Sequence, residues 1–402
     1  MRLLFIHQNI PGQFIHLVRA LARDGRHQVV FITKRADRQM HNVISLPYAP
    51  RRAAGTSTHH YLRRLEDAVL HGQEVVRVMT ALKAKGFSPD VVIGHPGWGE
   101  LLFVKDVFPD APLLSYCEYF YGPDDVDFER GVFTEAKLDH RLQRRLDNAH
   151  LLLSLEAADL GWAPTEWQKN HHPRRYQPNI EVVFDGVDTR VVKPDPAARF
   201  ELPDGRGLTA EDEVVSFVAR GLEPHRGFPQ FIRALPELLS RRPKAQVVIA
   251  GEDKVFYGAA PGKDLSWRQK MLQEIALDEK RVHFVGRIEH GEYVKLLQVA
   301  RVHVHLTLPY VLSWSFFEAM SAGCLVVASD TEPVREALRH GENGLSAPFG
   351  EPDMLAGAIA GAIEAPDAPD LRQAARRLIE TRYSLDICLP QQLAMIDRLL
   401  GR

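Results

Sequence analysis

Cysteine is scarce in this 402-residue sequence, which has only three: Cys117, Cys324 and Cys388. All three lie in apolar surroundings and none has the CxxC spacing, which argues against a disulfide scaffold and a zinc site. We interpret them as small buried hydrophobic residues. The net charge is also close to zero, at -2, so the composition does not favour nucleic acid as a partner.

Long hydrophobic runs are absent as well. No apolar stretch approaches the roughly 20 residues that span a bilayer, and the opening RLLFIHQNIPGQF becomes polar too early for a secretory signal. A hydrophobic content of 45% with 25% charged residues is typical of a globular protein. We therefore expect a cytoplasmic protein, and its length suggests two domains.

What the sequence does contain is a regular alternation of short apolar strands and helix-like segments. This pattern predicts an α/β protein with two doubly wound parallel sheets, joined through a connecting stretch at about 188–212. The predicted strands are 3–7, 28–33, 90–94, 113–116, 151–154 and 181–184 in the first half, and 214–219, 245–250, 283–285, 302–306 and 325–328 in the second. The predicted helices are 14–24, 61–85, 101–108, 228–241, 265–277, 293–299, 316–322, 354–364 and 391–400.

Three polar or glycine-containing segments of the first half follow predicted strands, where parallel sheets bind ligands. Gly12, in the turn NIPGQF, would let the backbone approach a phosphate or sugar closely. The turn is not GxGxxG, so a nicotinamide-binding fingerprint is absent. His95 is a candidate site residue, although a lone histidine is more often structural. Glu118 lies among aromatic residues, a setting that can raise a carboxyl pKa or stack a sugar.

Two segments of the second half suit a diphosphate. Arg220 and Arg226 lie on one turn before a helix, where fixed cations offset the charge of a leaving diphosphate; the plain alternative is a solvated basic loop. Ser313 and Ser315 are good caps for a helix start, whose N–H groups can seat an anion. Glu318 lies roughly one turn further in, where it can accept hydrogen bonds from sugar hydroxyls.

The run FFEAMSAGCLVVASDTEPVREALRHGENGLSAPFGEP resembles the C-terminal half of the glycosyltransferase family 4 signature. That signature has two glutamates separated by seven residues. Glu318 matches the second, whereas Tyr310 stands at the first. ARGLEPHRG resembles the family segment with an arginine and a second basic residue beside a glycine, and VVFDGVDT, VVIAGED and HFVGRIEH resemble three further segments.

The resemblance implies a GT-B fold, with two Rossmann-like domains facing a central cleft. It implies an acceptor domain at 1–182, a donor domain at 183–375, and a C-terminal helix at 376–402 that returns to the first domain. The residues assigned to catalysis are His95, Glu118, Arg220, Arg226 and Glu318. Those assigned to the donor are Gly12, Gln13, Arg220, Arg226, Gly251, Glu252, Arg287, Ile288, Tyr310, Ser313, Trp314, Ser315 and Glu318.

The function that the resemblance implies is retaining transfer of a sugar from a nucleotide-diphosphate sugar to a hydroxyl of a glycan, lipid-linked or protein acceptor. No cofactor and no metal are expected, although Asp125-Val126-Asp127 has the DxD spacing of metal-dependent transferases. The alternatives are a GT-B nucleotide-sugar epimerase and, because of Tyr310, a non-catalytic nucleotide-sugar-binding protein. The clusters Arg51-Arg52, Arg63-Arg64, Arg144-Arg145 and 171–175 are solvated surface by default, but together could contact an anionic membrane at its inner face.

Overall fold

A computed structural model of the chain describes residues 1–122, 138–365 and 367–401. The Asp125-Val126-Asp127 segment lies outside the described residues. The chain divides into two compact units. Unit 1 contains the described residues 1–122, 138–186 and 385–401, and unit 2 contains those of 187–384. The divisions therefore follow Gly186 and Ser384, whereas the predicted divisions were after 182 and 375.

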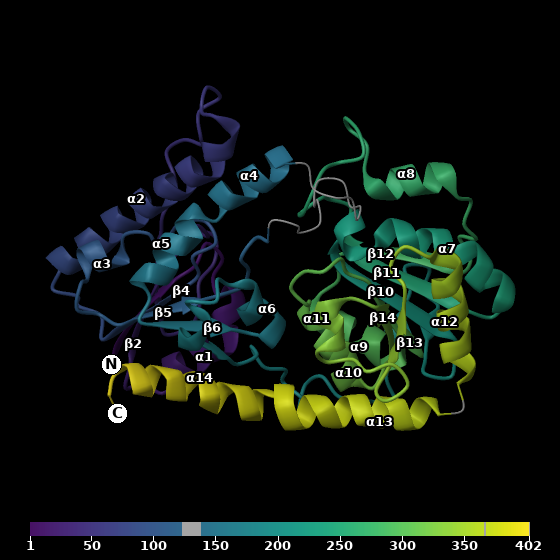
Figure 1. Cartoon of the computed structure of the whole chain (residues 1–402). Helices are drawn as coiled ribbons and strands as arrows, with labels where there is room; N and C mark the ends of the chain where they lie inside the picture. Colours follow the sequence, from purple (N-terminus) through teal and green to yellow (C-terminus); the bar gives the residue numbers. More distant parts are fainter. Residues whose placement is uncertain (123–137, 366, 402) are drawn as a thin grey trace. The chain divides into compact units, whose positions relative to one another are not determined.

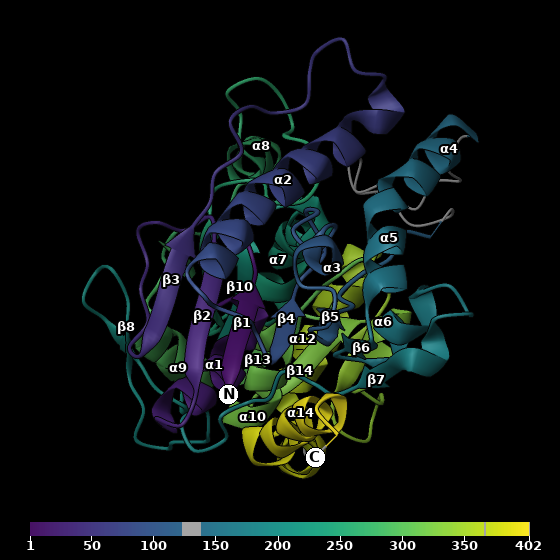
Figure 2. The ribbon, with the colours of Figure 1, turned by 90° about the vertical axis from the view of Figure 1, so that its left-hand side faces the viewer.

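Unit 1 is built on a parallel sheet of seven strands. Its strands are β1 (Arg2–Ile6), β2 (Gln28–Thr33), β3 (Val43–Pro47), β4 (Val91–Gly94), β5 (Leu113–Tyr116), β6 (Leu160–Ala163) and β7 (Ile180–Val182). They lie side by side in the order β3-β2-β1-β4-β5-β6-β7, which can be followed in Figure 2. β4 and β5 are buried throughout, as expected for central strands of a sheet covered on both faces.

Helices cover both faces of this sheet. They are α1 (Ile15–Arg23), α2 (Arg63–Ala84), α3 (Val104–Val107), α4 (Leu138–Asp147), α5 (Ala149–Ala157), α6 (Glu166–His171) and α14 (Leu385–Leu399), with the short helices η1 (Gly12–Phe14), η2 (His60–Leu62) and η3 (Gln177–Asn179). Figure 1 shows α2, α3 and α5 on one face of the unit and α1 with α14 on the other. The core under α2 and α3 includes Leu4, Val30 and Val92 from three adjacent strands.

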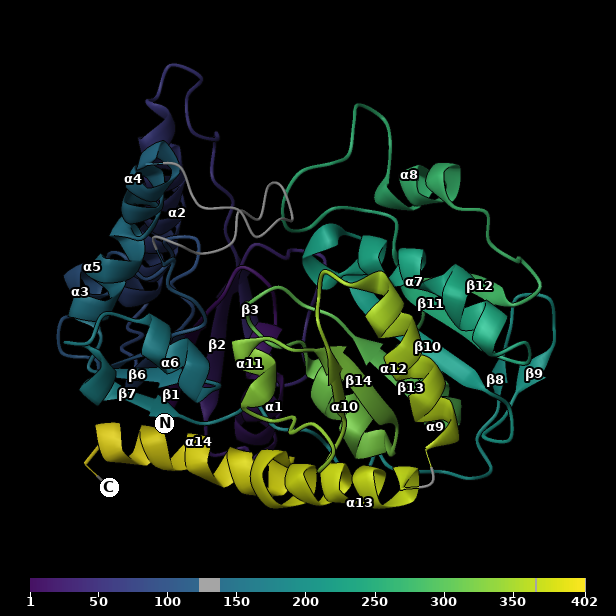
Figure 3. The same cartoon turned by 45° about the vertical axis from the view of Figure 1, so that its right-hand side comes forward.

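Unit 2 has a parallel sheet of six strands. These are β10 (Val214–Gly221), β11 (Gln246–Glu252), β12 (Val282–Gly286), β13 (Val302–His305), β14 (Leu325–Ser329) and β15 (Leu345–Ala347), in the order β12-β11-β10-β13-β14-β15; β8 (Phe200–Glu201) and β9 (Gly207–Leu208) form a separate hairpin. The helices are η4 (Pro224–Arg226), α7 (Phe228–Arg241), α8 (Trp267–Glu274), α9 (His290–Val299), α10 (Trp314–Ala322), α11 (Glu332–Arg335), α12 (Pro352–Glu364), α13 (Ala368–Leu378) and η5 (Ile379–Tyr383). Figure 3 shows α7 and α12 on one side of the sheet and α10 and α13 on the other.

Both sheets reverse their strand order at a corresponding place. In unit 1 the chain moves outward from β1 to β3 and then returns to the other side of β1 with β4. In unit 2 β10 and β13 have the same relation. In open α/β sheets, ligands bind outside the carboxyl ends of the strands at this switch point. The segments that follow β1, β4, β10 and β13 are therefore the first places to look for a site.

Most predicted elements are confirmed, with exceptions in both units. The predicted strand 151–154 is wrong, because it lies inside helix α5. A short apolar run fits a buried helix as well as a strand, and leucine and alanine favour the helix. The elements that were not predicted include strands β3, β6 and β15 and helices α6 and α13. The three cysteines are buried and free, as expected. In the described part of the chain, no helix is long and apolar enough to cross a membrane.

Candidate functional site

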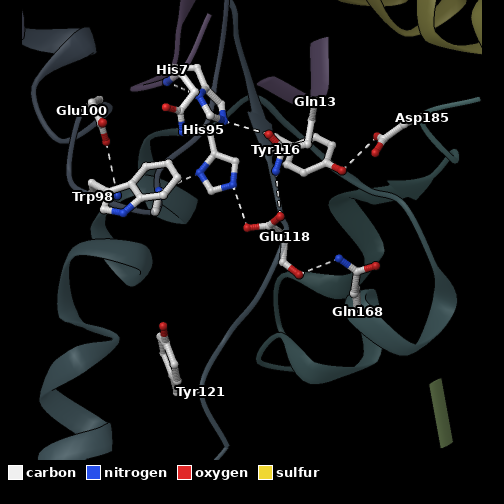
Figure 4. Close-up of polar contacts among 12 residues, drawn as sticks. His7, Gln13, His95, Trp98, Glu100, Tyr116, Glu118, Tyr121, Gln168 and Asp185 are labelled. Atoms are coloured by element: carbon white, nitrogen blue, oxygen red, sulfur yellow. Dashed lines mark hydrogen bonds and ion pairs between the residues drawn. The ribbon is translucent and has the colours of Figure 1, made fainter. Parts of the chain in front are cut away.

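The carboxylate of Glu118 is the centre of a hydrogen-bonded cluster in unit 1 (Figure 4). The Nε2 of Gln13 donates to one of its oxygens (2.7 Å), and His95 lies 3.1 Å from the other. Gln168 donates to its backbone carbonyl (2.7 Å). The structure therefore brings together three predicted residues that come from the ends of three different strands, together with Gln168, which was not predicted.

His95 is held in one orientation and one tautomer. Its Nδ1 accepts the N–H of Gly97 (3.0 Å), so the hydrogen-bond pattern assigns the proton to Nε2, which donates to Glu118. The ring is stacked between Trp98 and Tyr116, at centroid distances of 5.0 and 5.5 Å. A histidine confined in this way presents a fixed N–H donor to the carboxylate.

The pKa of Glu118 is lowered, which corrects the expectation that its aromatic surroundings raise it. Burial alone would raise this pKa, but the hydrogen bonds from His95 and Gln13, together with the electrostatic attraction of the His95 ring, outweigh burial. The side chain is 26% exposed, and each carboxylate oxygen has a second lone pair. Glu118 is thus an ionised acceptor that an incoming hydroxyl can reach.

His7 follows β1 as His95 follows β4, and it completes the cluster. Its Nδ1 accepts the N–H of Asn9 (2.8 Å), so its Nε2–H donates to the Oε1 of Gln13 (2.8 Å). This bond fixes the Gln13 amide with its NH2 group toward Glu118. His7 was not predicted as a site residue, although its position at a strand end at the switch point was a usable signal.

We expect His7 to make the fold sensitive to mild acid. Burial and the neighbouring His95 lower the pKa of His7 to about 3, whereas the unfolded chain binds this proton near pH 6.5. The His7 contribution to the free energy of unfolding is therefore lost as pH falls below 6.5, by about 2 kcal/mol between pH 7 and pH 5. Denaturant unfolding of the wild type and of His7→Phe at both pH values measures this loss, which should shrink by that amount in the variant. Equal losses in the two proteins would contradict it.

Gly12 has a structural role beside this cluster. Its φ is +56°, and a Cβ at this position would lie 2.8 Å from the imidazole of His7. We expect Gly12→Ala to lower the free energy of unfolding by roughly 2–4 kcal/mol, part from the left-handed backbone and part from displaced His7. Gly25→Ala is the matched control, because Gly25 has φ +70° with nothing within 4 Å. Urea unfolding should show a cost of only about 1–2 kcal/mol there. An equal loss of unfolding free energy in Gly12→Ala and Gly25→Ala would show that displacing His7 costs nothing.

Arg226 is the best-anchored cation of unit 2. It lies in η4 after β10, and its guanidinium donates to Thr307 Oγ1 (3.0 Å) and to the carbonyl of Val311 (3.2 Å). The rings of Tyr257 and Tyr310 are each 5.9 Å from it. Thr307 follows β13, so this bond joins the ends of the two strands at the switch point. Tyr310, which replaces the first signature glutamate, thus lies beside an arginine.

Arg220 is held by an aromatic contact. Its guanidinium lies over the ring of Phe256, 4.1 Å from the centroid, a cation–π distance. Phe256 belongs to the loop after β11, which carries no recognisable motif, so this partner could not be read from the sequence.

The start of α10 has the predicted serine cap. Ser313 Oγ accepts the N–H of Ser315 (3.3 Å) and also the Ser315 hydroxyl (2.9 Å). The N–H of Phe316 donates to the carbonyl of Ser313 (3.1 Å). The N–H groups of Ser315 and Phe316 therefore already have partners within the helix start. An anion bound here would have to replace the 3.3 Å bond between Ser315 and Ser313. Trp314 is the first residue of the helix and is 39% exposed.

Glu318 lies one turn into α10 and is oriented by α9. The hydroxyl of Tyr293 donates to its Oε2 (2.8 Å), and His290 lies 3.4 Å from its Oε1. The Glu318 side chain is 18% exposed, and each oxygen keeps a lone pair for another donor. Neither partner was predicted, because an acceptor role says nothing about which residues fix the carboxylate.

A pocket of about 280 Å³ lies at the ends of β11 and β12. Three predicted donor residues line it, whereas Ile288 is not among its described lining residues. Glu252 pairs with Lys254 (2.9 Å) and Arg287 (3.7 Å) at this pocket. The lining residues are Leu222, Ile249, Gly251, Glu252, Asp253, Lys254, Arg268, Phe284, Gly286 and Arg287.

Several arginines of the basic clusters in the first half contact other residues of unit 1. Arg52 pairs with Glu66 and Arg175 with Glu156. Figure 4 shows Tyr121, whose ring lies under the guanidinium of Arg64 at 4.2 Å. The two ion pairs offset part of the positive charge of these clusters. Among the described residues, no group of three or more His, Cys, Asp or Glu side chains could hold a metal ion.

Comparison with known proteins finds matches over both halves of the chain. Residues 25–192 match the family described as Glycosyl transferase family 4 group, and residues 199–381 match Glycosyl transferases group 1. Over 175 residues the chain is 29% identical to a phosphatidyl-myo-inositol mannosyltransferase of Mycolicibacterium smegmatis, which covers 42% of this chain and 41% of that protein. The chain spans about half the length of the curated relatives it matches.

Solved structures match over the full length. The HepE protein of Anabaena in complex with UDP-glucose has a TM-score of 0.70 and 17% identity, covering 99% of this chain and 100% of that one. The sucrose-phosphate synthase of Thermosynechococcus elongatus has a TM-score of 0.74 and 18% identity, covering 100% and 99%. At this identity the likeness shows the fold alone. The solved structures therefore show the GT-B fold, and the two family matches, which together span 25–192 and 199–381, show that the chain belongs to glycosyltransferase family 4.

Proposed function

We propose that the chain transfers a sugar from a nucleoside diphosphate sugar to an acceptor hydroxyl, with retention of configuration. The observation that carries the proposal is the anchoring of Arg226, whose guanidinium binds the backbone of Val311 two residues before the cap of α10. A fixed guanidinium and a helix start on the same short segment suit a diphosphate, because both provide N–H donors and positive charge. The UDP-glucose bound by HepE supports a donor of this class.

Unit 2 would hold the donor. Arg220 and Arg226 would stabilise the negative charge that grows on the diphosphate as the sugar bond breaks, and Glu318 would accept from the ribose hydroxyls. The pocket at β11 and β12 would receive the base. We assign no protein nucleophile. The leaving phosphate would assist deprotonation of the acceptor on the same face of the sugar, which accounts for retention. The positive charge would come from the arginines and the helix start, so no metal would be required.

Unit 1 would hold the acceptor at the Glu118 cluster. An acceptor hydroxyl can donate to the ionised carboxylate, while His95 and Gln13 hold the carboxylate in place. The chemistry recognised here is that of a neutral hydroxyl-bearing group, because an anion would be repelled by Glu118.

A ligand screen followed by a turnover assay tests the proposal. Thermal shift over uridine, adenosine and guanosine diphosphate sugars identifies the donor, because a ligand that binds the folded state stabilises it. We expect release of nucleoside diphosphate that depends on the acceptor, a product with the anomeric configuration of the donor by NMR, and unchanged turnover in EDTA. Epimerised donor without transfer, or binding without turnover, would contradict transfer. Loss of activity in EDTA would contradict metal independence.

A further inference from the structure

Glu223 is a carboxylate buried in the turn that separates the two arginines. It lies between β10 and η4 and has no exposed surface. Its Oε2 accepts two backbone N–H groups, from Phe256 (2.9 Å) and Tyr257 (2.8 Å), while its Oε1 has no hydrogen-bond partner among the described residues. Burying a carboxyl group is unfavourable unless hydrogen bonds compensate. The compensation here comes from a loop 33 residues further along the chain.

This loop follows β11 and passes directly over the end of β10. The N–H of Leu222 donates to the carbonyl of Glu252 (3.0 Å). A Cβ on Gly221 would lie 2.5 Å from the carbonyl of Lys254 and 2.7 Å from the ring of Phe256. The glycine therefore permits the close approach, and the bonds of Glu223 hold the loop where it crosses.

The same two loop residues supply contacts to the arginines. Phe256 lies under the guanidinium of Arg220 at 4.1 Å, and the ring of Tyr257 is 5.9 Å from that of Arg226. The residues whose N–H groups bind Glu223 thus present their side chains to the two cations. The buried Glu223 carboxylate is thus connected through this loop to both arginines.

We propose that Glu223 is a positioning residue, which orders loop 254–257 and through it orients Arg220 and Arg226. The importance of the arginines rests on the proposed function, whereas the ordering of the loop does not. Arg226 is also bound to Thr307 and Val311, so the effect falls mainly on Arg220. What the loop requires of Glu223 is one side-chain oxygen that accepts both N–H groups. Glutamine still has one such oxygen, whereas alanine has none.

Trypsin cleavage after Lys254 reports the order of the loop without any ligand. Lys254 is exposed and lies two residues before Phe256, and proteases cut where the chain opens locally. We expect Glu223→Ala to raise the cleavage rate at this bond by about tenfold, and Glu223→Gln to stay within about threefold of the wild type. Glu213→Ala is the matched control, because Glu213 pairs with Arg242 in the same unit and, among the described residues, has no hydrogen bond or ion pair with the loop. It should leave this cleavage unchanged.

Kinetics separate positioning from a general loss of stability. We expect Glu223→Ala to lower kcat/KM for the donor by about tenfold, with Glu223→Gln restoring it. The effects of Glu223→Ala and Arg220→Ala should be strongly non-additive, because both remove the same oriented cation. Three results would overturn the proposal. They are a wild-type rate of cleavage after Lys254 in Glu223→Ala, a loss of kcat/KM as large in Glu223→Gln as in Glu223→Ala, and additive effects of Glu223→Ala and Arg220→Ala.

Hydrogen exchange in the wild-type protein keeps the test decisive if Glu223→Ala does not fold. The amides of Phe256 and Tyr257 should exchange at least tenfold more slowly than unprotected amides. Exchange at the unprotected rate would overturn the ordering of the loop by Glu223. If the wild type binds no nucleotide sugar, the proposed function fails, while the cleavage and exchange results still decide whether Glu223 orders the loop.

Discussion

Arg226→Ala should lower kcat for sugar transfer by about 10²–10³-fold, the loss typical of removing one preorganised donor from a developing anion. The guanidinium is already fixed by Thr307 and Val311, so no ordering is required when the diphosphate leaves. Among the described residues its other N–H groups have no hydrogen-bond acceptor, so they can bind the leaving group. Initial-rate kinetics with saturating donor and acceptor measure this loss.

Two variants make the result specific. Arg226→Lys keeps the charge but has one ammonium in place of a planar fork, so we expect an activity between those of alanine and the wild type. Arg233→Ala removes an exposed arginine of α7 that pairs with Glu274, and it should behave as the wild type. If Arg226→Ala retained more than a third of the wild-type kcat, Arg226 would not stabilise the leaving diphosphate.

The fold was largely predictable because the central strands are apolar runs bounded by turns. Strands 28–33 and 113–116 and helix 228–241 agree with the structure at both ends. Strand β3 was missed because it is an edge strand with no buried residue, so its sequence lacks a continuous apolar signal. The mistaken strand 151–154 has the opposite cause: its three consecutive leucines form an apolar run that is too short to distinguish a buried helix from a strand.

The site was predictable at strand ends and unpredictable where a partner comes from elsewhere in the chain. His95 and Glu118 were found by their positions after β4 and β5. Glu223 was passed over, because an acidic residue in a turn is usually solvated, and its burial depends on N–H groups that lie 33 residues away. Tyr293 was missed for the same reason, since its contact with Glu318 depends on how α9 packs beside α10.

Glu118→Gln is the second substitution with a large expected effect, a loss of at least about 10²-fold in kcat/KM for the acceptor. Two donors, the NH2 group of Gln13 and Nε2–H of His95, converge on the two oxygens of the carboxylate. Glutamine has one oxygen, so one of these donors would face an NH2 group and the cluster would open. Donor binding, measured by thermal shift, should not change, because the cations and Glu318 that we propose to hold the donor are all in unit 2. Glu181→Gln is the control, since Glu181 is an exposed partner of Arg398 in the same unit.

The pH dependence of the free energy of unfolding tests the role of Glu118 independently. Burial would raise the pKa of Glu118, but His95 and Gln13 hold it below the usual value, so the carboxylate is protonated only at a lower pH than in the unfolded chain. Its contribution to stability is present above the unfolded pKa and is lost as pH falls through the lower folded pKa. Wild-type stability should therefore contain an acid-dependent part near and below pH 4.5 that Glu118→Gln lacks. An acceptor kcat/KM within threefold of the wild type in Glu118→Gln would place the acceptor away from this cluster.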